Sequence, residues 1–167
     1  MSEAGAGNDD TAGQEPASRP PRFVPDRFAV PTALVAGGLR LEPLGPQHNA
    51  ADYAAWTGSI EHIRATPGFS DGNWPDPDMT LEQNEADLRR HAEDFARRAG
   101  FTYTVLDEAS GDVVGCVYIY PARRPGHDAQ LQSWVRADYA ARDAELRAAL
   151  RDWLAVAWPF TAVDYHL

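Results

Sequence analysis

The amino-acid sequence predicts an α/β domain with a mixed, mostly antiparallel sheet that is flanked by helices. Three apolar stretches of strand length follow one another at residues 101–108, 112–120 and 128–136, separated by short polar turns. A helical stretch, Tyr139–Trp158, comes directly after them. A second helix is marked by Thr80, which begins a capping box. Strands joined by short turns pair antiparallel, and the helices bury one face each against the sheet.

The composition is that of one globular domain. The chain has 167 residues, of which 44% are hydrophobic, enough to build a sizeable core. Its net charge is −10, and all 15 basic residues are arginine. The acidic balance argues against nucleic acid and anionic membranes as partners, because both attract basic surfaces. Without lysine, neither a Schiff base nor a lysine nucleophile can form.

Cysteine content and hydropathy indicate where the protein works. Cys116 is the only cysteine, so an internal disulfide and a thiolate metal cluster are excluded. Its apolar strand favours a small core residue over a nucleophile. No segment reaches the roughly 18 apolar residues of a membrane helix, and the N-terminus lacks the pattern of a secretion signal. A cytoplasmic protein without a metal site is therefore expected.

The chain is expected to consist of a tail, an arm and one domain. Residues 1–21 are rich in small and polar residues and predict a disordered tail. Residues 22–38 carry scattered apolar residues interrupted by prolines, which predicts an extended arm laid over the domain. Residues 39–167 form the domain, and it begins with a half-buried strand, Leu39–Leu44, in which apolar and polar residues alternate.

A short helix and a long loop are predicted next. The sequence predicts a short helix over Gln47–Trp56, and residues 57–79 are rich in Gly, Pro and Asp without clear periodicity. A connection of that length is more often a binding loop than a passive linker. The substrate-contact candidates from this region are Trp56, His62, Arg64 and Trp74. For His62 the alternative is an ordinary surface loop.

The helix that begins at Thr80 is the clearest in the sequence. Its apolar stripe consists of Leu81, Leu88, Ala92, Phe95 and Ala99. Gly100 is expected to supply the left-handed residue that ends the helix. The i,i+4 pairs Glu85–Arg89 and Glu93–Arg97 indicate a solvated face rather than a site.

In two of the predicted strands, polar and aromatic side chains gather on one face. In residues 112–120, Cys116, Tyr118 and Tyr120 share one face. In residues 128–136, one face carries Gln130, Gln132, Trp134 and Arg136. Such a face cannot be buried without water or other hydrogen-bond partners, because unpaired amides in a core cost free energy. It therefore either meets solvent or lines a wet pocket.

The order of these elements resembles the GNAT superfamily of N-acetyltransferases over residues 39–167. The likeness lies in one strand, two helices, three strands, a helix and a strand, with the turn Ala140–Glu145 before the last helix. The resemblance implies an acetyl-CoA or other acyl-CoA cofactor, whose pyrophosphate such proteins hold on a glycine-rich turn at a helix start. Carried onto this chain, it implies cofactor contacts by Trp134, Val135, Arg136 and Arg142.

Two features depart from the family pattern. The glycines of the turn are replaced by Asp143 and Glu145, which would repel a pyrophosphate and instead stabilise the start of their own helix. The family also continues past the fifth strand with a further helix and strands, whereas this sequence ends at Leu167. The cofactor turn is thus degenerate and the C-terminus shortened.

Two functions of different classes remain open. The first is an acyl-CoA-dependent N-acyltransferase, in which a small-molecule or peptide amine attacks the thioester directly. The second is a protein of the same fold that transfers no acyl group and binds a small ligand or a partner protein. The catalytic candidates are Tyr118, Tyr120 and His127. His127 beside Asp128 is a candidate base, and its alternative role is to shape the turn.

The C-terminal strand predicts a homodimer. Residues Thr161–His166 leave a strand edge uncovered, and uncovered edges recruit other chains. Large apolar side chains lie nearby in the sequence: Trp153, Trp158, Phe160 and Tyr165. The alternative is a monomer in which the arm, Phe23 to Val35, folds back over that edge.

Overall fold

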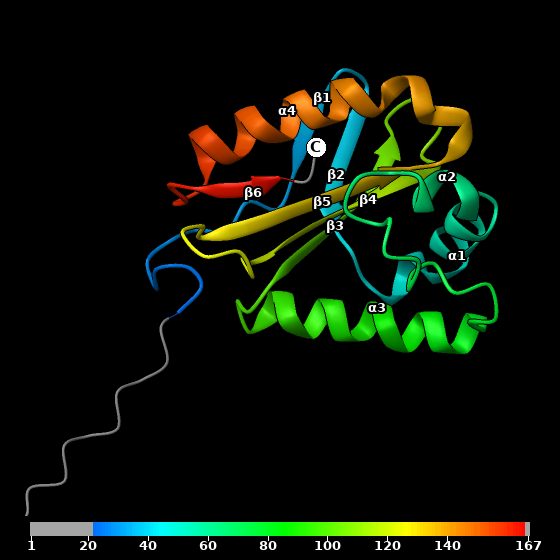
Figure 1. The fold of residues 1–167 in the computed structure, drawn as a ribbon, viewed down its shortest axis with the longest axis horizontal. Helices are drawn as coiled ribbons and strands as arrows, with labels where there is room; N and C mark the ends of the chain where they lie inside the picture. The colour runs from blue at the N-terminus through cyan, green and yellow to red at the C-terminus, as the bar shows by residue number, and fades with distance from the viewer. Residues whose placement is uncertain (1–21, 166–167) are drawn as a thin grey trace, which may run out of the picture.

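A single sheet forms the centre of the protein. The computed structural model describes residues 22–165, and the predicted tail lies outside them. Within these residues six strands follow the order β1-β2-β3-β4-β5-β6 (Figure 1). Neighbouring strands pair antiparallel except β5 and β6, which are parallel. The strands are β1 (Leu34–Ala36), β2 (Leu39–Pro43), β3 (Phe101–Asp107), β4 (Val113–Pro121), β5 (Ala129–Val135) and β6 (Val163–Tyr165).

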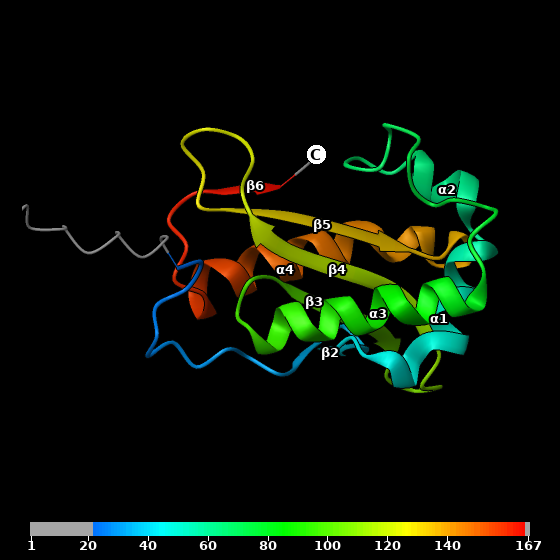
Figure 2. The ribbon, with the colours of Figure 1, turned by 90° about the horizontal axis from the view of Figure 1, so that it is seen from below.

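Helices cover both faces of this sheet. They are η1 (Pro46–His48), α1 (Asn49–Thr57), α2 (Ile60–Arg64), α3 (Leu81–Ala96), η2 (Ala137–Arg142) and α4 (Asp143–Ala157). Helix α4 lies on one face, and α3 with α1 lies on the other (Figures 1 and 2). The predicted mixed α/β fold is therefore confirmed. None of the helices within residues 22–165 has the length and apolar character needed to span a membrane.

Each face of the sheet has its own core. Against α4 pack the apolar sides of the strands, including Ile119, Leu131 and Val135, together with Leu150 and Trp158. On the opposite side, Cys116 and Trp134 of the strands pack against Trp56 of α1 and Leu88 of α3. The alternation expected for β4 and β5 thus assigns their residues to two cores.

The arm of residues 22–38 packs on the α4 face. The Phe23 ring stacks on Phe160 at a centroid distance of 5.1 Å and on Phe101 at 5.8 Å. Phe28 lies against Trp158 at 5.4 Å. One part of the arm is not merely extended, since β1 pairs with β2.

This packing bears on the predicted homodimer. Trp158 and Phe160, which suggested an apolar surface in need of a partner, already stack on each other at 5.7 Å and on rings of the arm. Strand β6 still has an edge opposite β5, and His166 lies outside the described residues. The dimer stays a prediction that now rests on that edge alone.

Helix ends differ from the expectations in three places. The capping box is present, since Gln83 N donates to Thr80 Oγ1 at 3.1 Å and Thr80 N to Gln83 Oε1 at 2.9 Å. At the other end of α3, however, Arg98 takes the left-handed conformation with φ 60°. Gly100 is needed for another reason: a Cβ there would overlap the Tyr120 ring.

The other two differences concern short helices. The loop predicted at residues 57–79 contains the short helix α2. Its residue Ile63 is fully buried, so this helix packs on the core. The helix predicted from Tyr139 begins instead as the 3-10 turn η2, and regular α-helix starts at Asp143. The spacing of apolar residues alone does not distinguish a 3-10 helix from the α-helix that follows it.

Candidate functional site

A pocket lies between α3, the segment that follows α2, and the polar face of β4 and β5. Its volume is about 330 Å³, within the usual range for a small-molecule site. We call it the α3 pocket. Its lining residues are Gly68, Phe69, Asp71, Asn73, Trp74, Met79, Asp87, Arg90, His91, Tyr118, Arg123, Gln130 and Gln132. Of the two alternatives for the glutamine-rich strand face, the structure shows the one in which Gln130 and Gln132 line a pocket.

Hydrogen bonds fix the segment that forms the outer wall of the α3 pocket. Gln132 Nε2 donates to the carbonyl of Gly68 at 3.0 Å, and Arg64 Nη2 donates to the carbonyl of Pro75 at 2.7 Å. The Tyr53 hydroxyl donates to the carbonyl of Met79 at 2.9 Å. These bonds hold main-chain groups of an irregular segment, so the pocket wall has a defined position.

Aromatic rings form one side of the α3 pocket. Phe69 and Trp74 have ring centroids 5.7 Å apart, and Phe69 meets Tyr118 edge-on at 6.2 Å. Trp74 also lies 5.9 Å from Trp56 and from Trp134 in the core below. This side therefore offers flat apolar surface for a ligand.

His91 and its neighbours form the polar side. His91 Nδ1 lies 2.9 Å from the Tyr120 hydroxyl and 2.9 Å from Thr102 Oγ1. On the other side of the ring, Nε2 is 3.6 Å from Asp87 Oδ2. Burial raises the pKa of the Asp87 carboxyl, but the neighbouring His91 and Arg90 outweigh it, so the net pKa is lowered. Asp87 is therefore a carboxylate at neutral pH.

The two tyrosine candidates of β4 remain protonated. The Tyr118 hydroxyl accepts the Trp134 Nε1 hydrogen at 3.1 Å, and burial raises the Tyr118 pKa far above its ordinary value. Burial also raises the pKa of Tyr120 to about 12. Both phenols therefore keep their hydrogen at neutral pH, and neither can serve as a base there. Burial likewise raises the pKa of the Cys116 thiol, which agrees with a core residue.

A buried polar network supports α3 from below. Asn84 Nδ2 donates to Asp52 Oδ2 at 3.1 Å, and Asn84 Oδ1 accepts the Trp56 indole hydrogen at 3.0 Å. Asp52 is only 4% exposed. Burial raises the pKa of its carboxyl to about 6, partly offset by the bond from Asn84. Trp56, a predicted substrate contact, is fully buried and belongs to this network.

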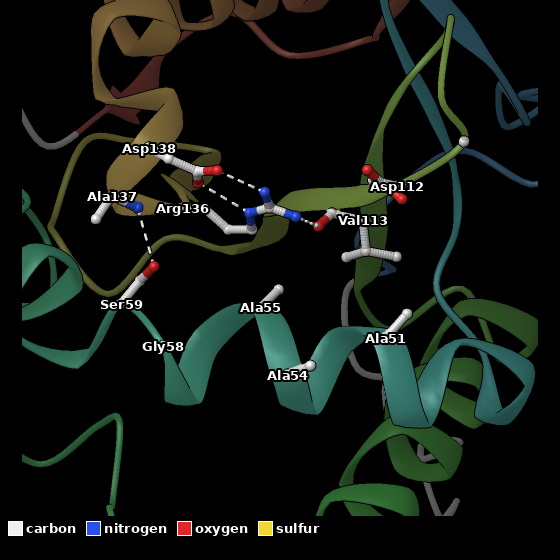
Figure 3. A pocket seen from close by; sticks show the side chains of 11 residues that line it. Ala51, Ala54, Ala55, Gly58, Ser59, Asp112, Val113, Arg136, Ala137 and Asp138 are labelled. Atoms are coloured by element: carbon white, nitrogen blue, oxygen red, sulfur yellow. Dashed lines mark hydrogen bonds and ion pairs between the residues drawn. The ribbon is translucent and has the colours of Figure 1, made fainter.

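A second hollow, which we call the α1 groove, opens beside the end of β5 (Figure 3). Its volume is about 550 Å³, and it is lined by Ala51, Ala54, Ala55, Gly58, Ser59, Gly111, Asp112, Val113, Arg136, Ala137 and Asp138. Two hydrogen bonds of 3.0 and 2.6 Å join the Arg136 guanidinium to Asp138, and a third of 3.2 Å reaches the carbonyl of Val113. Because its charge is matched by a carboxylate, Arg136 does not make this groove an open anion site.

The start of α4 is where the family resemblance would place an acyl-CoA pyrophosphate. Arg142 Nε donates to Glu145 Oε2 at 3.1 Å, and Arg142 Nη2 donates to the carbonyl of Gly37 in the β1–β2 turn. The Glu145 carboxylate lies so close to Gly37 that a Cβ there would overlap it. Asp143 Oδ2 accepts from Arg147 Nε at 3.0 Å.

These contacts bear on whether the start of α4 could hold the cofactor. Two carboxylates stand in the first turn of α4 and are paired with arginines of the same segment. Carboxylates are favourable in the first turn of a helix because of its dipole, the same dipole that would attract a phosphate, although no side-chain hydrogen bond caps α4. Two paired carboxylates thus stand where the family resemblance would place the pyrophosphate.

The predicted site residues are spread over several places. Of the substrate set, Trp74 lines the α3 pocket, whereas His62 lines a separate hollow with Thr57 and Ala137. Of the cofactor set, Trp134 lies in the core beneath α3 and Val135 in the core beneath α4. His127 lies in the β4–β5 hairpin, with Nδ1 3.2 Å from the carbonyl of Pro125, and does not line the α3 pocket.

Sequence reasoning missed His91 and Asp87. They lie one helical turn apart on α3, and a carboxylate four residues before a histidine is the signal that would have found them. The charged pairs on the same helix had indicated only a solvated face. Within residues 22–165, no group of histidine, cysteine or acidic side chains is arranged to hold a metal ion.

Comparisons with solved structures place this fold among the acetyltransferases. The ribosomal-protein-S5-alanine acetyltransferase from Vibrio fischeri aligns with a TM-score of 0.57 and 13% identity over 73% of this chain and 66% of its own. A putative GnaT-family acetyltransferase from Bordetella pertussis aligns with a TM-score of 0.51 and 22% identity, over 73% of this chain and 72% of its own. RimL, a ribosomal L7/L12 alpha-N-protein acetyltransferase solved with coenzyme A, aligns with a TM-score of 0.56 and 14% identity, over 72% of this chain and 66% of its own.

These likenesses have a limited extent. The chain spans slightly less than two thirds of the Vibrio fischeri protein, with 66% of its length covered. No protein-family model matches the sequence, and neither does any curated protein. The element order, the sheet and the structural neighbours together show that this chain has the fold of the GNAT acetyltransferases.

Proposed function

We propose that this protein binds a small amine-bearing molecule in the α3 pocket. The observation that carries the proposal is the pairing, in one cavity of about 330 Å³, of an aromatic side with a polar side formed by His91 and Asp87. The amine is an aliphatic one attached to an apolar or aromatic body. Acyl transfer is a second candidate and is considered separately below.

The chemistry of the two sides supports this ligand class. Asp87 is a carboxylate next to an imidazole, and both accept hydrogen bonds from an amine or ammonium group. Phe69 and Trp74 offer ring faces, which attract both apolar groups and cations. The net charge of −10 further favours a cationic ligand over an anionic one.

Acyl transfer from an acyl-CoA is the second candidate, and the fold favours it. The structural neighbours are named as acetyltransferases, and one was solved with coenzyme A. An amine in the α3 pocket would be the acceptor in such a reaction. The first turn of α4 speaks against it, because Asp143 and Glu145 do not fit the pyrophosphate. We therefore place amine binding first and acyl transfer second.

Amine binding is tested with phenethylamine as the probe. Calorimetric titration of the full chain is expected to show binding, and titration of Trp74→Ala is expected to show a loss of about tenfold or more in affinity, because a ring face of the pocket is removed. Val156→Ala, a change at an exposed position of α4, is the matched control. Equal affinity in Trp74→Ala and the control would place the ligand outside the α3 pocket.

Acyl transfer is tested with acetyl-CoA and free CoA. If the carboxylates at α4 exclude the pyrophosphate, neither compound binds at millimolar concentration, and the double variant Asp143→Gly with Glu145→Gly gains affinity. Binding of acetyl-CoA to the unmodified chain at micromolar concentration, with acetylated phenethylamine detected by mass spectrometry, would instead establish the transferase.

A further inference from the structure

We propose that Nε2 of His91 accepts a hydrogen bond from the amine of the ligand. Tyr120 and Asp94 are then positioning residues, which hold this histidine in the tautomer that leaves Nε2 free to accept. The inference rests on the proposed function and deepens it, since it names the recognised group as a nitrogen that carries hydrogen. It is carried by the hydrogen bonds around the imidazole.

The first step concerns the Tyr120 hydroxyl, which has one hydrogen to give. It donates that hydrogen to Asp94 Oδ2 at 3.0 Å. The Asp94 carboxylate is also paired with Arg97, which keeps it an acceptor. In its 2.9 Å contact with His91 Nδ1, the tyrosine oxygen must therefore accept, and Nδ1 must donate.

The second step concerns Thr102, the other neighbour of Nδ1. Its Oγ1 lies 2.9 Å from His91 Nδ1. A threonine hydroxyl has two lone pairs and a hydrogen that rotates. Thr102 can therefore turn its own hydrogen away and accept from Nδ1, so a hydrogen on Nδ1 suits both neighbours.

The third step follows from the imidazole itself. A neutral imidazole carries one hydrogen, so a hydrogen on Nδ1 leaves the lone pair on Nε2. Nε2 is 3.6 Å from Asp87 Oδ2, too far for a direct hydrogen bond. Two acceptors at this separation can both be reached by one ligand nitrogen, which gives the α3 pocket a recognition point for N–H donors.

The arrangement distinguishes two kinds of cation. A primary ammonium donates to Nε2 and to the Asp87 carboxylate. A quaternary ammonium has the same charge and can stack on the aromatic side, but it has no hydrogen to donate. We expect phenethylamine to bind about tenfold or more tightly than its trimethylammonium derivative, because hydrogen bonds involving a charged group are lost.

Two substitutions at His91 separate the roles of its nitrogens. His91→Asn keeps an amide near the position of Nδ1 and loses the acceptor at Nε2, so phenethylamine affinity is expected to fall about tenfold or more. His91→Gln reaches the position of Nε2 and is expected to retain most of the affinity. Thermal unfolding of both variants checks that each is folded.

The positioning role of Tyr120 is tested by NMR of the His91 side chain. Heteronuclear NMR of the histidine side chains is expected to show His91 with its hydrogen on Nδ1 in the unmodified chain. In Tyr120→Phe the hydrogen is expected to be redistributed towards Nε2, with a loss of phenethylamine affinity and little effect on the trimethylammonium derivative. A tyrosine with a purely structural role would weaken both ligands equally.

The outcomes that contradict the inference are distinct from those that contradict the proposed function. If phenethylamine does not bind the unmodified chain, the proposed function falls and the inference falls with it. If it binds, and binds His91→Asn equally well, only the inference is overturned. A hydrogen found on Nε2 in the unmodified chain would likewise overturn it.

Discussion

The two faces of the sheet are built on different principles. The face under α4 is packed with aliphatic and aromatic side chains and is closed at its end by the arm. The face under α3 has a smaller apolar core, a buried polar network around Asn84, and the α3 pocket. A single strand serves both, since Leu131 of β5 points to the first face and Gln132 to the second.

The contrast is between a face dominated by apolar packing and a face that also carries polar groups. Close packing of apolar groups stabilises a fold without regard to particular partners. A binding surface needs polar atoms within reach of a ligand, and these reduce how much apolar area the same face can bury. In this protein the α3 pocket is on one face, and the larger apolar core is on the other, where a further hollow of about 660 Å³ lies between α4 and β6.

The largest expected effect is in the α4 core. Leu150 is fully buried there, and Leu150→Ala is expected to lower the free energy of unfolding by about 2–5 kcal/mol, because it removes apolar contact and leaves a cavity. Val156→Ala on the same helix is the control, since Val156 is 88% exposed, and a change within about 0.5 kcal/mol is expected. Urea unfolding of both variants measures the difference. Similar losses in the two would mean that the α4 face is not the main core.

A pH-dependent effect is expected on the α3 face. Burial raises the pKa of Asp52 from 3.8 to about 6, so the folded state keeps this proton at a higher pH than the unfolded state does. Its stabilising contribution is complete below the unfolded pKa and is lost as pH rises through about 6. The loss amounts to at most about 3 kcal/mol.

The comparison of Asp52 with a neutral analogue isolates this effect from the other carboxyls. Asp52→Asn cannot ionise, and its carbonyl oxygen can still accept from Asn84. The variant is therefore expected to gain stability relative to the unmodified chain as pH rises from about 4 to 7. Urea unfolding across that range is the measurement. A difference between the two proteins that does not change with pH would show that Asp52 is not protonated more readily in the fold.

A smaller effect is expected where α3 meets β3. A Cβ at Gly100 would overlap the Tyr120 ring, so Gly100→Ala is expected to cost about 1–3 kcal/mol by overpacking and to move Tyr120 away from His91. Gly58 has ordinary helical angles and its nearest neighbour is at 3.4 Å, which makes Gly58→Ala the control. If Gly100→Ala is as stable as the control and leaves the His91 NMR signals unchanged, the close approach seen here is not required.

The smallest expected effect concerns the solvated side of α3. Glu85 and Arg89 form an exposed pair at 2.7 Å, and Glu85→Gln is expected to cost only about 0.2–0.5 kcal/mol. The loss should shrink further at high salt, because exposed charges are screened. Thermal unfolding at low and high salt measures it, and a salt-independent loss would contradict a purely electrostatic pair.

Much of the fold could be predicted from the sequence because its signals are local. The capping box at Thr80 needs only residues three apart, and the alternation in β4 and β5 is a property of adjacent residues. Strand β1 could not be predicted in the same way. Its three residues become a strand only because β2 lies beside them, and short edge strands have little pattern of their own.

The site was predicted less well, for a related reason. The polar face of β5 was correctly identified as needing water or a pocket, and Trp74 does line the α3 pocket. Trp56 was assigned to the site because it is aromatic and near the loop, yet its side chain is fully buried. His91 escaped notice because its importance depends on Thr102 and Tyr120, which lie on other elements.

The sequence by itself determined the order of the elements, the two-sided character of β4 and β5, and the acids at the start of α4. Each of these depends on residues within a few positions of one another. Tertiary structure alone decided that the arm covers Trp158 and Phe160, that Arg142 reaches the carbonyl of Gly37, and that His91 meets Tyr120. Such contacts join segments far apart in the chain, and their geometry exists only once the sheet has brought those segments together.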